Sequence, residues 1–175
     1  MADPHNSGTR SFNMSRIRGK DTKPELIVRR MLHAAGFRFR LHRRDLPGSP
    51  DIVLPRHRAA VLIHGCFWHW HGCPMCRLPG TRMEFWREKL RKNVERDERN
   101  VGALCQDWRV CTVWECAVRG KVSLDHESLR SQILGFLTST RSHAEVSGRW
   151  SEDEFPGHDA LALDHSDNPV PSAAD

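Results

Sequence analysis

The sequence has few apolar stretches, and none of them is long. Its first eight residues contain no apolar segment, which predicts that there is no secretory signal. The longest aliphatic run, residues 59–63, is far too short to cross a bilayer, and no internal repeat is visible. We therefore expect a cytoplasmic protein, in which the six cysteines serve as metal ligands and buried thiols rather than as disulfides.

Acidic residues are scarce in most of the chain. Residues 1–139 contain 25 Lys and Arg against 14 Asp and Glu, whereas the remainder contains two Arg against eight acids. A basic body followed by an acidic tail predicts a polyanionic partner such as nucleic acid. The alternative is a basic surface that only keeps the protein soluble. At 175 residues, the chain is long enough for one domain with a real core.

The chain divides into a basic N-terminal arm (1–20), a folded domain (21–139) and an acidic tail (140–175) that we expect to be disordered. Capping boxes at Thr22–Glu25 and Thr81–Glu84 predict the starts of two helices, which end near Gly36 and Asp107. Alternating or apolar runs predict four strands, and a further helix follows them. The strands are expected at residues 37–41, 51–54, 59–63 and 109–114, and the last helix at 126–137.

The order α-β-β-β-α-β, followed by one more helix, is typical of a three-layer α/β fold. The spacing of apolar residues also predicts which side of each capped helix faces the core. For the first helix these residues are Leu26, Ile27, Met31, Leu32 and Ala35, and for the second they are Phe85, Leu90, Val94, Val101 and Leu104.

Residues 64–73, His-Gly-Cys-Phe-Trp-His-Trp-His-Gly-Cys, combine metal-binding and aromatic side chains. Cys66, His71 and Cys73 have the spacing C-x4-H-x-C, and Cys116 follows the fourth predicted strand. Three local ligands and one distant ligand would complete a closed tetrahedral zinc site. Cys76 competes for the fourth position, because Cys73 and Cys76 form a C-x2-C pair. The remaining thiols, Cys105 and Cys111, are expected to be buried.

A second group of residues has the chemistry of a hydrolase. Asp51 begins a buried strand, where it is either a Mg²⁺ ligand or a turn cap. His64 ends the next strand and His69 follows it, so either imidazole is a candidate for proton transfer. Glu25 and Asp97 lie on the two flanking helices and are candidates to orient these imidazoles. Their alternatives are capping for Glu25 and a solvated charge run for Asp97.

At this point six motifs, from about residue 9 to residue 120, resemble the very short patch repair (Vsr) DNA mismatch endonucleases. They are Arg10-Ser-x-Asn-Met14, Leu46-Pro-Gly-x-Pro-Asp51, His64-Gly-Cys-Phe-Trp-His69, Thr81-Arg-x-Glu-Phe-Trp86, Lys92-Asn-Val-Glu-Arg-Asp97 and Val113-Trp-Glu-Cys116. The resemblance implies a restriction-endonuclease-like core. It also implies Mg²⁺-dependent nicking of the thymine strand, 5′ of the T in a T:G mismatch left by 5-methylcytosine deamination. Very short patch repair would start from that nick.

The resemblance also implies roles for single residues. Asp51 and the main-chain oxygen of Ile63 would bind Mg²⁺, with two ions expected; a familiar member has a hydroxyl residue at the position of Ile63. His69 would activate water, His64 would assist at the phosphate, and Glu25 and Asp97 would be the acidic partners of the imidazoles. One structural Zn²⁺ would be held by Cys66, His71, Cys73 and Cys116. DNA contacts would come from Met14, Phe67, Trp68, Trp86 and Asn93.

The implied partner is double-stranded DNA with a T:G mismatch, and the implied functional link is to a cytosine-5 DNA methyltransferase. Mismatch-repair proteins are further candidate partners. We expect a monomer, because one asymmetric mismatch needs no two-fold symmetry. Two other hypotheses compete with the nicking enzyme. One is a zinc-stapled module that binds mismatches without cleaving them, and the other is a hydrolase with an open, catalytic zinc site.

Overall fold

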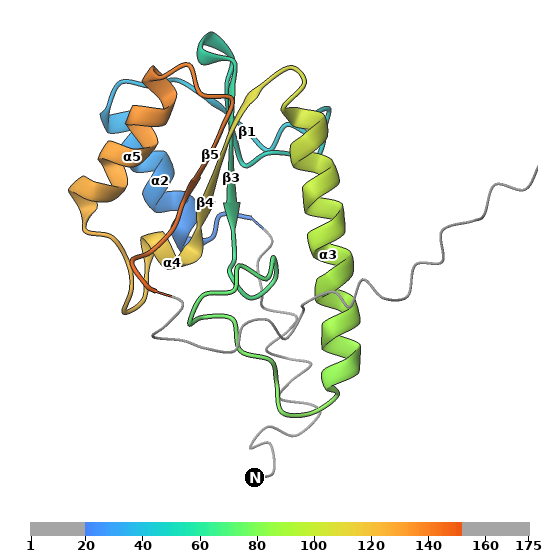
Figure 1. The fold of residues 1–175 in the computed structure, drawn as a ribbon. Coiled ribbons are helices and arrows are strands. Elements are labelled where there is room, and N and C mark those ends of the chain that lie inside the picture. Colours follow the sequence, from blue (N-terminus) through green and yellow to red (C-terminus); the bar gives the residue numbers. More distant parts are fainter. Residues whose placement is uncertain (1–19, 152–175) are drawn as a thin grey trace, which may run out of the picture.

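The structure is a computed structural model that describes residues 20–151. One five-stranded sheet lies between two layers of helices (Figure 1). Helices α2, α4 and α5 cover one face, and the long helix α3 covers the other. The helices are α2 (Lys23–Ala34), α3 (Met83–Leu104), α4 (Glu115–Val118) and α5 (His126–Thr138), with a 3-10 helix η1 (Pro55–His57). The strands are β1 (Arg40–Leu41), β2 (Ile52–Leu54), β3 (Ala59–His64), β4 (Arg109–Trp114) and β5 (His143–Val146). The predicted three-layer arrangement is therefore confirmed.

The strands lie in the order β1-β2-β3-β4-β5. The pairs β1–β2 and β2–β3 are antiparallel, whereas β3–β4 and β4–β5 are parallel. The turn of η1 and a left-handed Arg58 (φ 44°) close the β2–β3 hairpin. His64 pairs with Trp114 at the carboxyl ends of the parallel strands. The loop after β3, which carries the metal-binding and aromatic side chains, and the helix α4 therefore both begin at the same end of the sheet.

The core has one part on each face of the sheet. The larger part packs α2 and α5 against the sheet and includes Leu32, Ile52, Val61 and Phe136. The smaller part, Leu62, Leu104 and Val110, lies under α3. Neighbouring residues of β3 thus point to opposite faces, and both are buried. The apolar runs of β2 and β3 are therefore buried on both faces of the sheet.

Helix α2 begins as predicted, and Met31 and Leu32 of its predicted core side are buried, but the first turn differs. The Thr22 hydroxyl accepts from the Glu25 amide, and the Glu25 carboxylate accepts from the Thr22 amide, which completes the capping box. Leu26 and Ile27, predicted to be buried, are each 37% exposed. Glu25 and Arg29 are buried in their place. These two residues are four positions apart and form an ion pair, so the helix can turn a charged pair inward.

Helix α3 lacks the predicted capping box. Its N-cap is Arg82 in a left-handed conformation (φ 55°), with no side-chain capping bond. The chain therefore turns into the helix one residue later than Thr81 would allow. The prediction for Phe85 was also wrong, because it is 46% exposed. Only Leu90 and Leu104 of this helix are buried, and its N-terminal part extends past the sheet (Figure 1).

The acidic tail predicted to be disordered from residue 140 includes a strand. Residues 143–146 form β5, which pairs in parallel with β4, and Val146 is buried. The ladder of the neighbouring strand organises this short polar segment, which has no periodic signal of its own. The N-terminal arm, including Met14, and the end of the tail lie outside the described residues. Among the described helices, none combines the length and apolar character needed to span a membrane.

Candidate functional site

A cleft of about 1090 Å³ opens where β2, β3, the loop after β3 and the helices α2 and α3 meet. Its lining includes most of the residues that the sequence singled out. They are Glu25, Asp51, Ile63, His64, Phe67, Trp68, His69 and Asp97. Residues from four separate segments thus share one cavity, because the β2–β3 hairpin and the two flanking helices converge at this end of the sheet.

Asp51 lies immediately before β2 and faces the neighbouring strand. Its Oδ2 accepts a hydrogen bond of 2.7 Å from the main-chain N–H of Ile63. Burial raises the pKa of Asp51 to about 6, the Ile63 hydrogen bond opposes this shift, and the nearby Glu25 carboxylate adds to it. A carboxylate held largely out of water in a cleft is stabilised in its charged form by a bound cation. The fit to Mg²⁺ is reasonable, because this ion prefers one or two carboxylates and keeps several waters.

His64 and His69 lie against each other. Their rings stack with centroids 3.8 Å apart and planes 5° from parallel. His69 Nδ1 is 2.5 Å from Asp97 Oδ2. An ionised carboxylate only accepts, so Nδ1 carries the proton and donates it, and Nε2 of the neutral ring is left to accept. Of the two carboxylates expected to orient the imidazoles, Asp97 therefore contacts His69.

Burial determines the protonation of His64, and His69 in turn affects its carboxylate partner. Burial first of all, and then the neighbouring His69, lower the pKa of His64 to about 3, while Asp97 opposes the shift. His64 is therefore neutral at ordinary pH. Burial acts most strongly and raises the pKa of Asp97, but the hydrogen bond and charge of His69, together with His64 and Arg96, outweigh it and keep that pKa below its usual value. The site thus holds one neutral imidazole beside one imidazole backed by an ionised carboxylate.

Glu25 has different partners from those expected. Its carboxylate accepts from the Asp21 and Thr22 amides and from Arg29, whose Nη2 is 2.6 Å from Glu25 Oε2. The nearest imidazole in these contacts is that of His42, 3.9 Å away. Sequence reasoning missed Arg29 and His42. Arg29 could have been found from its i, i+4 spacing to Glu25 on the same helix. No local pattern indicated His42.

The four expected zinc ligands lie together. One ligand atom from each of Cys66, His71, Cys73 and Cys116 falls within 4.8 Å of every other, and the three thiols are buried. Cys116 Sγ is 3.4 Å from His71 Nδ1. Cys76 lies outside this group and donates its S–H to the Cys66 carbonyl. Hydrogen bonds from the neighbouring thiols lower the pKa of Cys73, and a thiolate is the form in which cysteine binds a metal.

The unpredicted strand β5 and its continuation support this cluster. His71 stacks on Trp114, with ring centroids 4.2 Å apart, and Trp114 Nε1 donates to Glu145 Oε2 at 2.9 Å. The Gly148 amide points at Cys116 Sγ, 3.3 Å away. A Cβ at Gly148 would lie 2.5 Å from the Val122 carbonyl oxygen, so only glycine fits there. The sequence analysis did not identify Glu145 and Gly148, which contact Trp114 and Cys116 beside the cysteine cluster.

An aromatic cluster adjoins the cleft, and two of its members, Phe67 and Trp68, line it. Phe67, Trp68 and Trp86 contact one another at centroid distances of 5.1 to 6.1 Å. The Lys89 ammonium lies 5.2 Å from the Trp68 ring and 5.4 Å from the Trp86 ring. Asn93 donates to the Trp68 carbonyl at 3.0 Å, so it holds the loop in place. Flat rings beside a cation suit stacking on nucleic-acid bases.

The fold and the cleft are compatible with phosphodiester hydrolysis, and comparison with known proteins identifies the class. The sequence model of the family described as "DNA mismatch endonuclease Vsr" matches residues 2–75. DNA mismatch endonuclease Vsr of Escherichia coli is 42% identical over 147 residues, which cover 83% of this chain and 94% of that protein. The type II nicking enzyme V.XorIIP of Xanthomonas oryzae is 48% identical over 117 residues, 66% of this chain and 86% of the relative.

A third relative, the type II nicking enzyme V.NmeAIP of Neisseria meningitidis, is 43% identical over 122 residues, which cover 69% of this chain and 87% of that enzyme. The protein is thus a nuclease that acts on DNA. The chain belongs to the Vsr family of DNA mismatch endonucleases.

Proposed function

We propose that this protein nicks duplex DNA at a T:G mismatch produced by deamination of 5-methylcytosine. It cleaves the thymine strand 5′ of the T, leaves a 5′-phosphate and a 3′-hydroxyl, and so starts very short patch repair. The observation that carries the proposal is the His69–Asp97 pair, stacked on His64 in the cleft that also contains Asp51. The names of the relatives, mismatch endonuclease and nicking enzymes, support it.

The two imidazoles have distinct tasks in this proposal. Asp97 accepts from Nδ1 of His69 and leaves Nε2 free to take the proton of the attacking water. The same carboxylate then stabilises the imidazolium that forms. His64 is kept neutral by burial and lies beside His69, where its ring nitrogen assists at the phosphate. Glu25 acts from the far side of Asp51 as part of the charged wall of the cleft.

Asp51 and the main-chain oxygen of Ile63 would hold Mg²⁺, with two ions in the complete site. The buried Asp51 carboxylate, with its raised pKa and Glu25 nearby, fits a cation. Mg²⁺ bound there supplies charge stabilisation for the attacking and leaving oxygens of the scissile phosphate. Cys66, His71, Cys73 and Cys116 would hold one structural Zn²⁺, because three sulfurs and one nitrogen form a closed tetrahedral set. Four protein ligands leave no open position, which argues against a catalytic zinc.

Phe67 and Trp68 would wedge into the base stack beside the mismatch, with Trp86 as their support. Unstacking a normal base step costs about a few kcal/mol. A T:G wobble is poorly stacked, so unstacking the bases there costs less. Stacking on the rings returns about 1–3 kcal/mol per base. Met14, on the arm outside the described residues, would enter from the opposite groove. Asn93 contributes by holding the Trp68 loop.

The setting of the reaction follows from the same chemistry. The protein would work as a monomer in the bacterial cytoplasm on nucleoid DNA. A cytosine-5 DNA methyltransferase would create its substrate indirectly, since deamination of the methylated base yields thymine. Mismatch-repair proteins are the further partners expected. The relatives are bacterial DNA-nicking enzymes, which supports this setting.

The deciding experiment uses an end-labelled duplex with one T:G mismatch in varied flanking sequences, with Mg²⁺ and then with EDTA. We expect a Mg²⁺-dependent nick on the thymine strand, immediately 5′ of the T, and no nick with Asp51→Ala. Asp45→Ala is the matched control, because Asp45 is an exposed carboxylate paired with Arg43 on the same loop. Mismatch binding without a nick in any context would instead favour a binding module and would overturn the proposal.

A further inference from the structure

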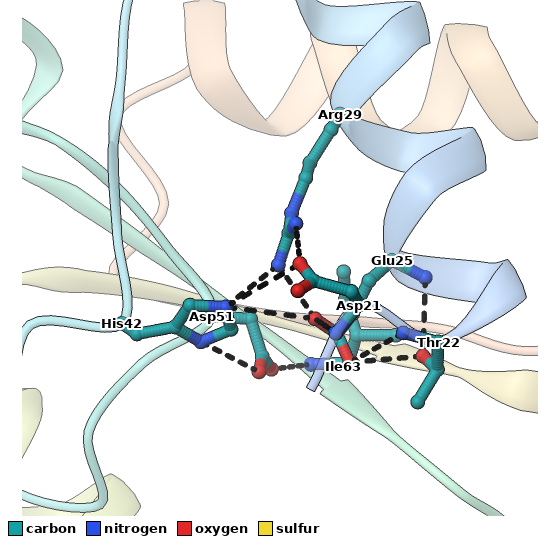
Figure 2. A network of polar contacts seen from close by, with 7 residues as sticks. All are labelled: Asp21, Thr22, Glu25, Arg29, His42, Asp51 and Ile63. Carbon is teal, nitrogen blue, oxygen red and sulfur yellow. Dashed lines mark hydrogen bonds and ion pairs between the residues drawn. The ribbon is translucent and has the colours of Figure 1, made fainter. Parts of the chain in front are cut away.

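A buried arginine connects three groups at the edge of the cleft (Figure 2). Arg29, on α2, is 8% exposed. Its Nη1 donates to Asp21 Oδ1 at 2.5 Å, and its Nη2 donates to Glu25 Oε2 at 2.6 Å. The same Nη2 lies 2.9 Å from Nε2 of His42. One guanidinium thus ties the start of α2 to the loop that precedes β2.

His42 lies between this arginine and Asp51. It follows β1 in a left-handed backbone conformation (φ 47°), and its N–H donates to the Asp51 carbonyl at 3.3 Å. Its Nδ1 is 3.9 Å from Asp51 Oδ1 (Figure 2). The other carboxylate oxygen, Oδ2, is taken by the Ile63 amide. The Asp51 side chain is therefore held between Ile63 on one side and the His42 ring on the other.

The arginine decides which nitrogen of His42 carries the proton. A guanidinium has five N–H donors and no acceptor. At 2.9 Å, Nε2 of His42 must therefore accept, and it has no proton of its own. The proton of the neutral ring is then on Nδ1, the nitrogen that faces Asp51. The N–H dipole is directed at the carboxylate, at a distance longer than a direct hydrogen bond.

The three acidic and imidazole groups here, Asp21, Glu25 and His42, are close enough to suggest a separate metal site. Arg29 argues against that role, because its positive guanidinium already contacts all three groups. A second cation there would meet the guanidinium at short range. The group is better suited to orienting a neighbour than to holding an ion.

We propose that His42, with its tautomer set by Arg29, is a positioning residue for the Asp51 carboxylate. This inference rests on the proposed function, in which Asp51 binds the catalytic Mg²⁺. The Arg29–His42 pair keeps Asp51 in one orientation, with a positive N–H edge at Oδ1, while Arg29 neutralises the buried Glu25. Groups that orient a metal ligand in this way typically contribute about 10–100-fold to metal affinity or activity.

The first test reads the tautomer directly. Long-range ¹H–¹⁵N correlation spectra of the zinc-loaded full chain report which nitrogen of each histidine carries the proton, and His42→Asn assigns the His42 signals. We expect the Nδ1–H form of His42, and loss of that preference in Arg29→Met. Arg30→Met, an exposed neighbour on the same helix, is the matched control and should leave the His42 signals unchanged. An Nε2–H form in the wild type would overturn the proposal, whether or not the protein nicks DNA.

The second test measures the Mg²⁺ concentration that gives half-maximal nicking. We expect His42→Ala to raise it about 10-fold without loss of zinc. His42→Asn should recover most of the affinity, because its amide places an N–H near the position of Nδ1 and asparagine tolerates positive φ. An unchanged Mg²⁺ midpoint in His42→Ala, with Asp51→Ala inactive, would remove the positioning role alone. Nicking by Asp51→Ala at the wild-type rate would instead overturn the proposed metal site.

Discussion

At the scale of single residues, the cleft depends on the orientation of its imidazole rings. Asp97 sets the ring of His69 through Nδ1, and Arg29 sets that of His42 through Nε2. His64 has no such partner in these contacts, and burial holds it neutral in a stack with His69. A tautomer is a choice between two nitrogens, so one charged neighbour per ring is enough to decide it.

The proposed base gives the first prediction. His69→Ala should lower the single-turnover nicking rate by about 10²–10⁴-fold, the usual contribution of a general base. Asp97→Asn should lower it by a similar factor, because the amide keeps the geometry but neither fixes the Nδ1–H tautomer nor supplies the charge that stabilises the imidazolium. Mismatch binding, followed by fluorescence anisotropy, should stay near the wild-type level in both. Equal rates for His69→Ala and wild type would remove His69 from the proton transfer.

At the scale of helices and strands, most residues of the site come from the ends of the elements rather than from their central turns or central residues. The carboxyl ends of β3 and β4 deliver His64 and Trp114 side by side. The start of α2 delivers Glu25, and its capping box fixes the carboxylate against Thr22. The end of α5 depends on Arg109, at the start of β4, which donates to the carbonyls of Phe136, Leu137, Ser139 and His57.

Arg109 gives a prediction for the stability of this junction. Arg109→Met should lower the free energy of unfolding by about 1.5–3 kcal/mol, the range for hydrogen bonds made by a charged group. The loss has a clear cause, because carbonyls at the end of α5 and after η1 lose their donor. Urea unfolding followed by circular dichroism measures it. Arg130→Met, on the exposed side of α5, is the control and should change stability little.

Gly148 gives a prediction for the segment after β5. Gly148→Ala should weaken zinc retention and lower the melting temperature, because its Cβ would overlap the Val122 and Cys116 carbonyls. Gly135→Ala is the matched control. In α5 its Cβ meets nothing within 4 Å, so helix propensity should stabilise the protein by about 0.5–1 kcal/mol. Zinc retention, measured by competition with a chelator, should fall only in Gly148→Ala. Equal retention in both variants would contradict the role of the segment.

At the scale of the whole molecule, the cysteine cluster joins parts that are distant in sequence. The loop after β3, the start of α4 and the segment after β5 all meet at Cys116. This end of the molecule has a small core of its own, centred on Cys66, Cys73, Trp114 and Cys116. The larger core, under α2 and α5, is built from apolar side chains. Metal binding should therefore control the cleft and the adjoining aromatic cluster more than the sheet.

Zinc removal gives the fourth prediction. A zinc-selective chelator in excess Mg²⁺ should abolish nicking and change tryptophan fluorescence, and added zinc but not more Mg²⁺ should restore both. Cys116→Ala should lose the zinc, whereas Cys76→Ala should keep it, because Cys76 lies outside the four-ligand group. Zinc content by atomic absorption checks both variants. Full nicking by a zinc-free protein would contradict the structural role.

Several elements could be predicted because their signals are local. The capping box of α2, the buried strands β2 to β4 and the helix α5 all follow from short-range patterns of capping and apolar residues. The predicted strand at 37–41 shortened to Arg40–Leu41, since only these residues find a ladder partner on β2. The side of α2 that faces the core was predicted correctly at Met31 and Leu32 but not at Leu26 and Ile27, because an ion pair allows Glu25 and Arg29 to be buried instead.

By itself, the sequence determined which residue types could meet. Its six motifs placed Asp51, His64, His69 and Asp97 on successive elements and carried the resemblance to the Vsr family. Only the tertiary structure decided the pairings: Asp97 with His69, Arg29 with Glu25 and His42, and β5 with β4. The physical reason is range. Capping and periodicity act within a few residues, whereas ion pairs, tautomers and sheet edges depend on neighbours that only folding brings together.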